Sequence, residues 1–377
     1  MSTNGFTSVS EYKTARAPGK LILSGEHAVV YGAPALSVAI DSYTDVWFTP
    51  IHRSAGLRTA FDNLSRGHFY PLEILKSFKQ GLDTRFEAFM RGELPVQKIM
   101  QRPDDLAVYT MASLLQVLPV PGRSSRRHLP VPGQLSSRSD LPLGAGMGSS
   151  SAVIAATIVL YEHLLGFQQN TKDRFERVRF CERLQHGKGS FTDAAAVVFG
   201  GMNLVRHEEV TAIDMEDDHP LLQGAGWYWV LHGTPEASTG ECVAAVRASY
   251  GQDHALWQSF EEITIALQSA LAEKRDPTDV IRENHRLLQK IGVVPEATAR
   301  FIEAVETAGG AAKISGAGST RGDYGGVKLV YLPGDDAMTS LMARYPERRW
   351  APLRVSPLGA HLRQGLPQTR ADARQVV

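Results

Sequence analysis

The period of the hydrophobic pattern changes several times along the chain. Short apolar runs alternate with turn residues over residues 12–50, which is typical of strands joined by tight loops. Two of these predicted strands cover residues 35–40 and 46–48. Over residues 68–95 and 104–118, apolar side chains recur every three or four positions, as they do on one face of a helix. The first third therefore predicts strands followed by helices.

The clearest helix comes next. Residues 149–165 are almost continuously apolar, and Gly166 stands where a helix C-terminal cap belongs. Further predicted elements are a helix at 171–185, strands at 195–205 and 227–232, helices from about 240 to 309, and strands at 311–315 and 327–332. Strands and helices in this irregular order favour an α+β fold.

Two segments are poor in regular pattern. Residues 119–140 are rich in Pro, Gly, Ser and Arg and predict a loop. They also contain the alternating Leu129, Val131 and Leu135, so a weak edge strand or hairpin stays open. The polar tail over 364–377 is expected to be disordered.

Composition excludes several classes of protein. The chain has 377 residues, with 40 basic and 40 acidic side chains, and no basic stretch predicts a nucleic-acid partner. The apolar stretch at 152–165 is interrupted by Glu162 and His163 and is too short to span a bilayer. The polar residues 1–12 do not resemble a secretory signal. We expect a cytoplasmic protein with no membrane partner.

Only two cysteines occur, Cys181 and Cys242, and their spacing fits neither a zinc site nor a disulfide framework. A reducing compartment is the simplest interpretation.

A glycine-rich segment at 142–151 leads directly into the apolar helix. Glycines let the backbone approach an anion closely, and the free amides and dipole of a helix N-terminus favour negative charge. Together they predict a phosphate cradle. A Walker A loop would need a lysine after its last glycine, but Ser149 follows Gly148 directly. A dinucleotide fingerprint also fits poorly, and an ordinary capped turn remains the alternative.

Two carboxylates follow this helix. Glu182 shares a helical face with Phe175, Val178 and Gln185, and burying a charge is unfavourable unless it is paired. Either a metal ion or a nearby arginine would compensate it. Asp193 ends a polar, glycine-containing loop, where it is either a helix cap or a general base for a substrate hydroxyl.

Two further patterns are weaker. Lys20 precedes an apolar strand, and Glu26 and His27 follow it, so the strand should separate them by roughly 17 Å unless it bends. Residues 312–319 form a second glycine-rich turn after a strand. A surface lysine and ordinary turns are the alternatives. Two such loops suggest a pocket that is closed from two sides.

Residues 17–32, 142–151 and 315–318 resemble, in sequence and in order, the three signature motifs of the GHMP kinase superfamily. The resemblance covers roughly residues 14–332, and within the superfamily the Gly-Glu-His-Ala-Val-Val wording at residues 25–30 is most similar to the mevalonate kinase family.

This resemblance implies a two-lobed α+β fold. A ribosomal-protein-S5-like α/β domain is expected at 12–215, and a ferredoxin-like α+β domain at 216–363.

The resemblance also implies an active site that uses ATP and Mg²⁺. Asp193 would be the catalytic carboxylate, and Lys20 would support it and stabilise the transferring phosphoryl group. The other implied roles are phosphate binding by Gly144, Ala145, Gly146, Met147, Gly148, Ser149 and Ser150, Mg²⁺ binding by Ser150 and Glu182, and substrate binding by Glu26, His27, Thr239, Gly316, Ala317 and Gly318.

The implied reaction is phosphorylation of the 5-hydroxyl of mevalonate. Two features depart from the mevalonate kinase motifs. Residues 319–326 form a longer, charged loop, and Lys188-Gly189 resembles a sequence motif of phosphomevalonate kinases. A phosphorylated acceptor therefore stays open, with Lys188 and Arg321 as candidate phosphate contacts. A non-catalytic binding or regulatory protein on this fold also stays open, as does a homodimer.

Overall fold

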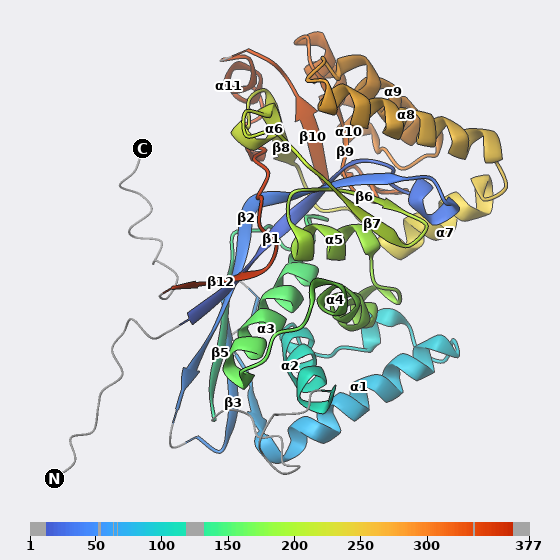
Figure 1. Ribbon diagram of the computed structural model, residues 1–377. Helices are drawn as coiled ribbons and strands as arrows, with labels where there is room; N and C mark the ends of the chain where they lie inside the picture. Colours follow the sequence, from blue (N-terminus) through green and yellow to red (C-terminus); the bar gives the residue numbers. More distant parts are fainter. Residues whose placement is uncertain are drawn as a thin grey trace.

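The computed structural model describes residues 13–51, 54–62, 64–65, 67–117, 132–334 and 336–364. The predicted tail, apart from Gln364, lies outside these residues, as do Leu129 and Val131. The described chain forms two lobes, each built on its own β-sheet (Figure 1). This confirms the α+β class.

The larger lobe contains an eight-stranded sheet in the order β12-β1-β2-β5-β3-β4, with β6 paired to β2 and β7 paired to β6. The strands are β1 Lys13–Ser24, β2 Ala35–Pro50, β3 Gly56–Phe61, β4 Phe69–Pro71, β5 Gly133–Ser139, β6 Met202–Arg206, β7 Glu209–Ile213 and β12 His361–Gln364. Only β3 and β5 run parallel among the described pairs.

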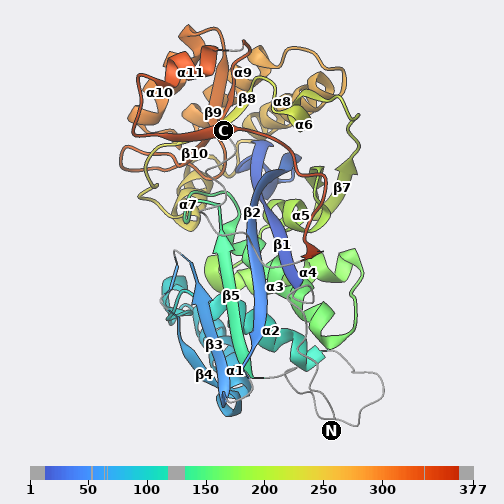
Figure 2. The same cartoon turned by 90° about the vertical axis from the view of Figure 1, so that its left-hand side faces the viewer.

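Helices cover one face of this sheet (Figure 2). They are α1 Leu75–Met90, α2 Asp105–Val117, α3 Ser149–Leu165, α4 Thr171–His186 and α5 Phe191–Phe199, with short 3-10 turns at Ala28–Tyr31, Leu72–Ile74 and Val96–Lys98. Helix α3 is apolar on all sides and packs on β1, β2, α2 and α4, as expected of a fully buried helix. Gly166 caps it, as predicted.

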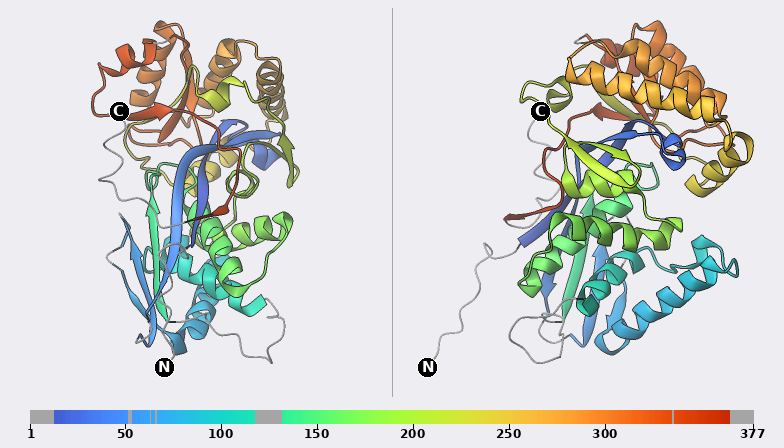
Figure 3. Two further views of the ribbon diagram at one scale, coloured as in Figure 1. Left: turned by 60° about the vertical axis from the view of Figure 1, so that its left-hand side comes forward. Right: turned by 45° about the vertical axis from the view of Figure 1, so that its right-hand side comes forward.

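The smaller lobe is a four-stranded antiparallel sheet in the order β11-β8-β10-β9, packed with helices (Figure 3). Its strands are β8 Trp227–Leu231, β9 Ala311–Ile314, β10 Val327–Tyr331 and β11 Arg349–Pro352. Its helices are α6 Pro220–Gln223, α7 Thr239–Tyr250, α8 His254–Ala272, α9 Thr278–Lys290, α10 Glu296–Thr307 and α11 Ala337–Met342.

The chain passes between the lobes more than once. It leaves the first sheet after Ile213, enters the second at Trp227, and returns to the first through β12. Helix α8 also packs on β1 and β2, and Ser24 Oγ lies 2.7 Å from Thr264 Oγ1 of this helix. The domain boundary at residues 215 and 216 stays a prediction.

Four predictions of local structure were wrong. Lys20 lies inside strand β1 instead of preceding it. Residues 195–199 are the second half of helix α5, because the Ser190 side chain caps Asp193 N–H, and a short apolar run does not distinguish a helix from a strand. Residues 35–50 form one continuous strand instead of two. Strand β5 lies between β2 and β3 instead of at an edge, although it buries Ser136 and Ser137.

Within the described ranges, we find no helix with the length and hydropathy needed to cross a bilayer.

Candidate active site

An ion pair joins the strand, the glycine-rich loop and a helix end. Lys20 Nζ of β1 lies 3.0 Å from Asp193 Oδ1 in the first turn of α5. The backbone N–H of Lys20 donates to Met147 O at 2.9 Å, so the strand holds the loop directly. The hydroxyls of Ser190 and Thr192 donate to Asp193 Oδ1 at 3.1 and 3.3 Å. The carboxylate is therefore fixed in orientation.

The glycine-rich loop takes a conformation that favours glycine. Gly144, Gly146 and Gly148 have φ angles of 70°, 80° and 75°. A Cβ on Gly148 would meet Lys20 Cγ at 2.8 Å. Gly148 begins α3 without a side-chain cap, so no side chain at this position competes for the first helical amides. This geometry suits an anion.

Glu182 of α4 is buried beside the start of α3. Its Oε1 accepts from Ser150 Oγ at 3.2 Å and from Ser151 Oγ, and its Oε2 accepts from Ser190 N–H at 3.0 Å. Burial and then the charge of Asp193 raise the pKa of Glu182 to about 7. Its partners are hydroxyls and an amide, so the alternative of an arginine salt bridge does not describe this residue.

The predicted helical face around Glu182 is only partly correct. Phe175 and Val178 are buried with it, whereas Gln185 is exposed.

These oxygens fit a magnesium ion that also binds a nucleotide. Mg²⁺ prefers hard oxygen ligands, usually takes one or two carboxylates, and keeps water and phosphate oxygens for its other positions. Ser150 and Glu182 offer a hydroxyl and a carboxylate, and the cation would relieve the repulsion between Glu182 and Asp193. The described residues contain no group of three or more His, Cys, Asp or Glu that would form an all-protein metal cage.

A second buried ion pair joins the two lobes. Glu26 follows β1, and its Oε1 accepts from Lys313 Nζ of β9. The side chains are 1% and 0% exposed, respectively. Burial raises the pKa of Glu26 and lowers that of Lys313. Sequence reasoning missed Lys313 as a site residue. The signal was present, because a lysine inside the short apolar strand at 311–314 needs a partner.

The first and third motifs also meet. His27 Nε2 lies 2.9 Å from Ala317 O, and His27 has a φ of 60°, a sparsely populated value outside glycine. Ser315 Oγ accepts from Ile22 N–H at 2.8 Å. Gly318, with a φ of 66°, has no room for a Cβ. These contacts bring the first and third motifs together from the two lobes.

Two predicted substrate residues are less constrained. Gly316 has a φ of 113° and open space where a Cβ would stand. Thr239 is exposed in the first turn of α7, three residues before Cys242, whose thiol lies 3.7 Å from Gly318 O. The structure places Thr239 in the helix whose Cys242 approaches the third motif.

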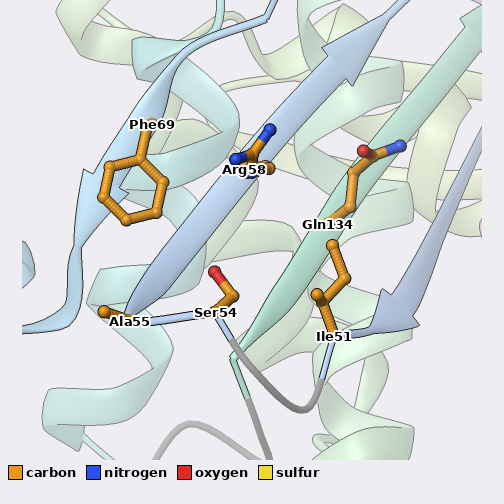
Figure 4. A pocket seen from close by; sticks show the side chains of 6 residues that line it. All are labelled: Ile51, Ser54, Ala55, Arg58, Phe69 and Gln134. Atoms are coloured by element: carbon orange, nitrogen blue, oxygen red, sulfur yellow. The ribbon is translucent and has the colours of Figure 1, made fainter.

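Two hollows in the described part of the chain lie away from these motifs. One of about 340 Å³ opens on the sheet and is lined by Ile51, Ser54, Ala55, Arg58, Phe69 and Gln134 (Figure 4). One of about 120 Å³ lies between α6, β8 and the end of α8. Neither contains a predicted site residue.

Comparison with known proteins finds relatives that match most of the chain. The family model of the GHMP kinases N terminal domain matches residues 120–201. Mevalonate kinase of Thermococcus onnurineus is 26% identical over 322 residues, which cover 81% of this chain and 86% of that protein. Phosphomevalonate kinase of a Streptomyces species is 27% identical over 385 residues, with 91% and 95% covered.

Solved structures share the fold. Mevalonate kinase of Methanococcus jannaschii superposes with a TM-score of 0.71 at 19% identity, covering 91% of this chain and 98% of that one. A phosphomevalonate kinase of Streptococcus pneumoniae, in complex with phosphomevalonate and AMPPNP, gives a TM-score of 0.63 at 16% identity, with 93% and 99% covered.

Proposed function

We propose that this chain is a kinase of the GHMP superfamily, which transfers the γ-phosphoryl group of ATP to the 5-hydroxyl of mevalonate. The observation that carries the proposal is the pair of Lys20 and Asp193 beside the glycine-rich loop. Several relatives that are named mevalonate kinase match most of the chain, which supports this acceptor.

In this proposal the protein supplies position and charge. Asp193 accepts the proton of the acceptor hydroxyl, and its three donors hold Oδ1 in place. Lys20 holds this carboxylate through the ion pair and stabilises negative charge that develops on the transferring group. The backbone of residues 144–149 binds the phosphates. ATP would supply the phosphoryl group, and Ser150 and Glu182 would hold the Mg²⁺ that neutralises charge on its phosphates.

The acceptor would lie between the first and third motifs. Glu26 and His27 come from the end of β1, and residues 316–318 come from the other lobe. Thr239 would close the site from α7. Because His27 is held by Ala317, movement of the lobes would change the acceptor site and the position of Lys20 together.

A phosphorylated acceptor is the second candidate, and the Streptomyces relative favours it. Such an acceptor needs extra cations in the site. Lys188 is 79% exposed and lies 3.7 Å from Glu208, and Arg321 donates to Glu241 at 2.9 Å. Both are engaged with carboxylates at the surface, which supports mevalonate over phosphomevalonate.

A coupled ADP-release assay with Mg²⁺-ATP tests this proposal when mevalonate and 5-phosphomevalonate are offered separately. Turnover on mevalonate alone is expected. Turnover only on the phosphorylated acceptor would replace it with the second candidate. Turnover on neither would contradict both and favour a non-catalytic role.

A further inference from the structure

Three basic side chains converge at one end of the smaller sheet. His232 directly follows β8, Lys328 lies in β10, and Arg348 directly precedes β11. The strands place them together, because Leu231 of β8 pairs with Val327 of β10 on one side and with β11 on the other. None of the three belongs to the predicted active site.

All three side chains are largely withdrawn from solvent. Lys328 is 0% exposed, and the side chains of Arg348 and His232 are 6% and 16% exposed. The guanidinium of Arg348 lies over the rings of Phe301 and Tyr345, 4.2 and 4.0 Å from their centroids. The cations are thus held in place by packing, and they do not extend into water.

This cluster has too little negative charge. Glu347, which is 55% exposed, lies 3.3 Å from Arg348 Nε and 3.8 Å from His232 Nε2. Lys328 Nζ donates to Gly326 O at 3.0 Å and has no carboxylate within ion-pair distance in the described chain. Arg348 Nη1 and His232 Nδ1 are buried without a hydrogen-bond partner among the described residues.

The electrostatics agree with this geometry. Burial and then the charge of Arg348 lower the pKa of Lys328 to about 7. Burial, Arg348 and Lys328 lower the pKa of His232. Uncompensated buried cations destabilise a folded protein, so a group that completes the cluster would be favoured.

We propose that His232, Lys328 and Arg348 form a binding site for a phosphate group, separate from the site for Mg²⁺-ATP. A guanidinium, an ammonium and an imidazole offer several donors to one dianion, and arginine suits phosphate oxygens especially. Glu347 occupies the exposed side of the cluster and is displaced when the anion binds. The ligand is either inorganic phosphate or a small phosphate ester.

The cluster lies next to the charged loop over 319–326, which departs from the superfamily pattern. The ring of Tyr324 packs edge-on against His232, with centroids 4.6 Å apart. The backbone of Gly326, which accepts the Lys328 bond, approaches Ala145 of the glycine-rich loop, since a Cβ on Gly326 would lie 3.5 Å from Ala145 O. Binding at the cluster is therefore positioned to alter nucleotide affinity.

Calorimetric titration of inorganic phosphate into the full chain tests the proposal. Saturating Mg²⁺-AMPPNP occupies the glycine-rich loop, so the phosphate that still binds reports the second site. We expect one site per chain. Lys328→Met and Arg348→Gln should each weaken binding roughly 10- to 100-fold, the effect of losing a charged hydrogen bond. Glu347→Gln should tighten binding, because it removes the competing carboxylate.

Arg349→Gln is the matched control, because Arg349 is exposed and directly follows Arg348 in the chain. The phosphate affinity of this variant should equal that of the unmodified chain. Melting curves check that each variant is folded. Equal phosphate affinity in the unmodified chain, Lys328→Met and Arg348→Gln overturns the proposal, as does the absence of binding beside AMPPNP. Unchanged affinity in Glu347→Gln overturns the displacement of Glu347.

A second titration with glycerol 3-phosphate distinguishes the two sources of the ligand. Tighter binding of the ester supports a phosphorylated metabolite, and tighter binding of inorganic phosphate supports the free ion. The test does not depend on kinase activity. A chain that binds phosphate here but turns over no alcohol would contradict the proposed function alone.

Discussion

Lys20 of β1 and Asp193 of α5 come from different elements, yet their charged groups lie 3.0 Å apart beside the glycine-rich loop. Asp193→Asn removes the proton acceptor and keeps the shape of the side chain. We expect turnover to fall by about 10²–10⁴-fold, the usual contribution of a general base. AMPPNP affinity should stay within a few-fold, as measured by calorimetry.

Asp173→Asn is a matched control for this variant. Asp173 occupies the same position in α4, where Asn170 caps its N–H as Ser190 caps that of Asp193, but it is exposed. Turnover by the Asp173→Asn enzyme should equal that of the unmodified chain. An Asp193→Asn enzyme with normal turnover would remove Asp193 from the mechanism.

The glycines at the two ends of α3 give a second comparison. Gly148 and Gly166 have φ angles of 75° and 70°, but only at Gly148 would a Cβ meet another side chain, that of Lys20. Gly148→Ala should therefore lower turnover at least tenfold, because it displaces Lys20. Gly166→Ala should cost about 1 kcal/mol of stability from backbone strain and leave turnover intact. Steady-state kinetics and urea unfolding separate the two effects. Equal kinetic losses would refute the steric argument.

Protonation of Glu182 should control magnesium binding. Its pKa is raised to about 7, and a carboxylate must be deprotonated to bind a metal. Below pH 7, the affinity for Mg²⁺ in the presence of AMPPNP should therefore fall roughly tenfold per pH unit. In Glu182→Gln, the affinity should be weak at every pH, and this slope should disappear. A slope that survives in the variant would assign the pH dependence to another group.

The same shift affects stability. The pKa of Glu182 lies above its ordinary value of 4.5, so the folded chain keeps this proton to a higher pH than the unfolded chain does. The contribution of Glu182 to stability is therefore present at low pH and is lost as pH rises towards 7. Mg²⁺-AMPPNP should raise the melting temperature more at pH 8 than at pH 5.5. An equal increase at both values would contradict the shift.

The Lys313 and Glu26 pair predicts non-additive unfolding energies. Removing one partner leaves a buried charge alone, so Lys313→Met and Glu26→Gln should each cost about 3–5 kcal/mol. The double variant leaves no unpaired charge and should cost clearly less than the sum of the two. Urea unfolding of the four proteins checks this prediction. Simple additivity would show that the two charges do not depend on each other.

Local patterns predicted the parts of this fold that local physics determines. Helix α3 and its cap at Gly166 follow from an apolar run bounded by glycines, and the helices between residues 240 and 309 follow from their period. The glycine-rich loop was also visible, because its conformation is available mainly to glycine.

Features that depend on tertiary contacts were not predictable. Strand β5 has a polar sequence, but its Ser136 and Ser137 are buried, and the strand lies between two neighbouring strands. Helix α5 and a strand have the same short apolar signature until Ser190 is seen to cap it. Lys313 and Glu26 are far apart in sequence, and no periodicity joins them. The grouping of His232, Lys328 and Arg348 likewise follows only from strand register.

Strand β12 has a consequence for how the protein is made. It pairs with β1 from Lys13 to Arg16, in the strand that carries Lys20 farther along. During synthesis, the edge of the first sheet therefore stays unpaired until residues 361–364 have left the ribosome, long after the rest of that lobe has emerged. The larger lobe is therefore completed last. Its folding depends on synthesis of the smaller lobe, whose residues lie in sequence between Ile213 and β12.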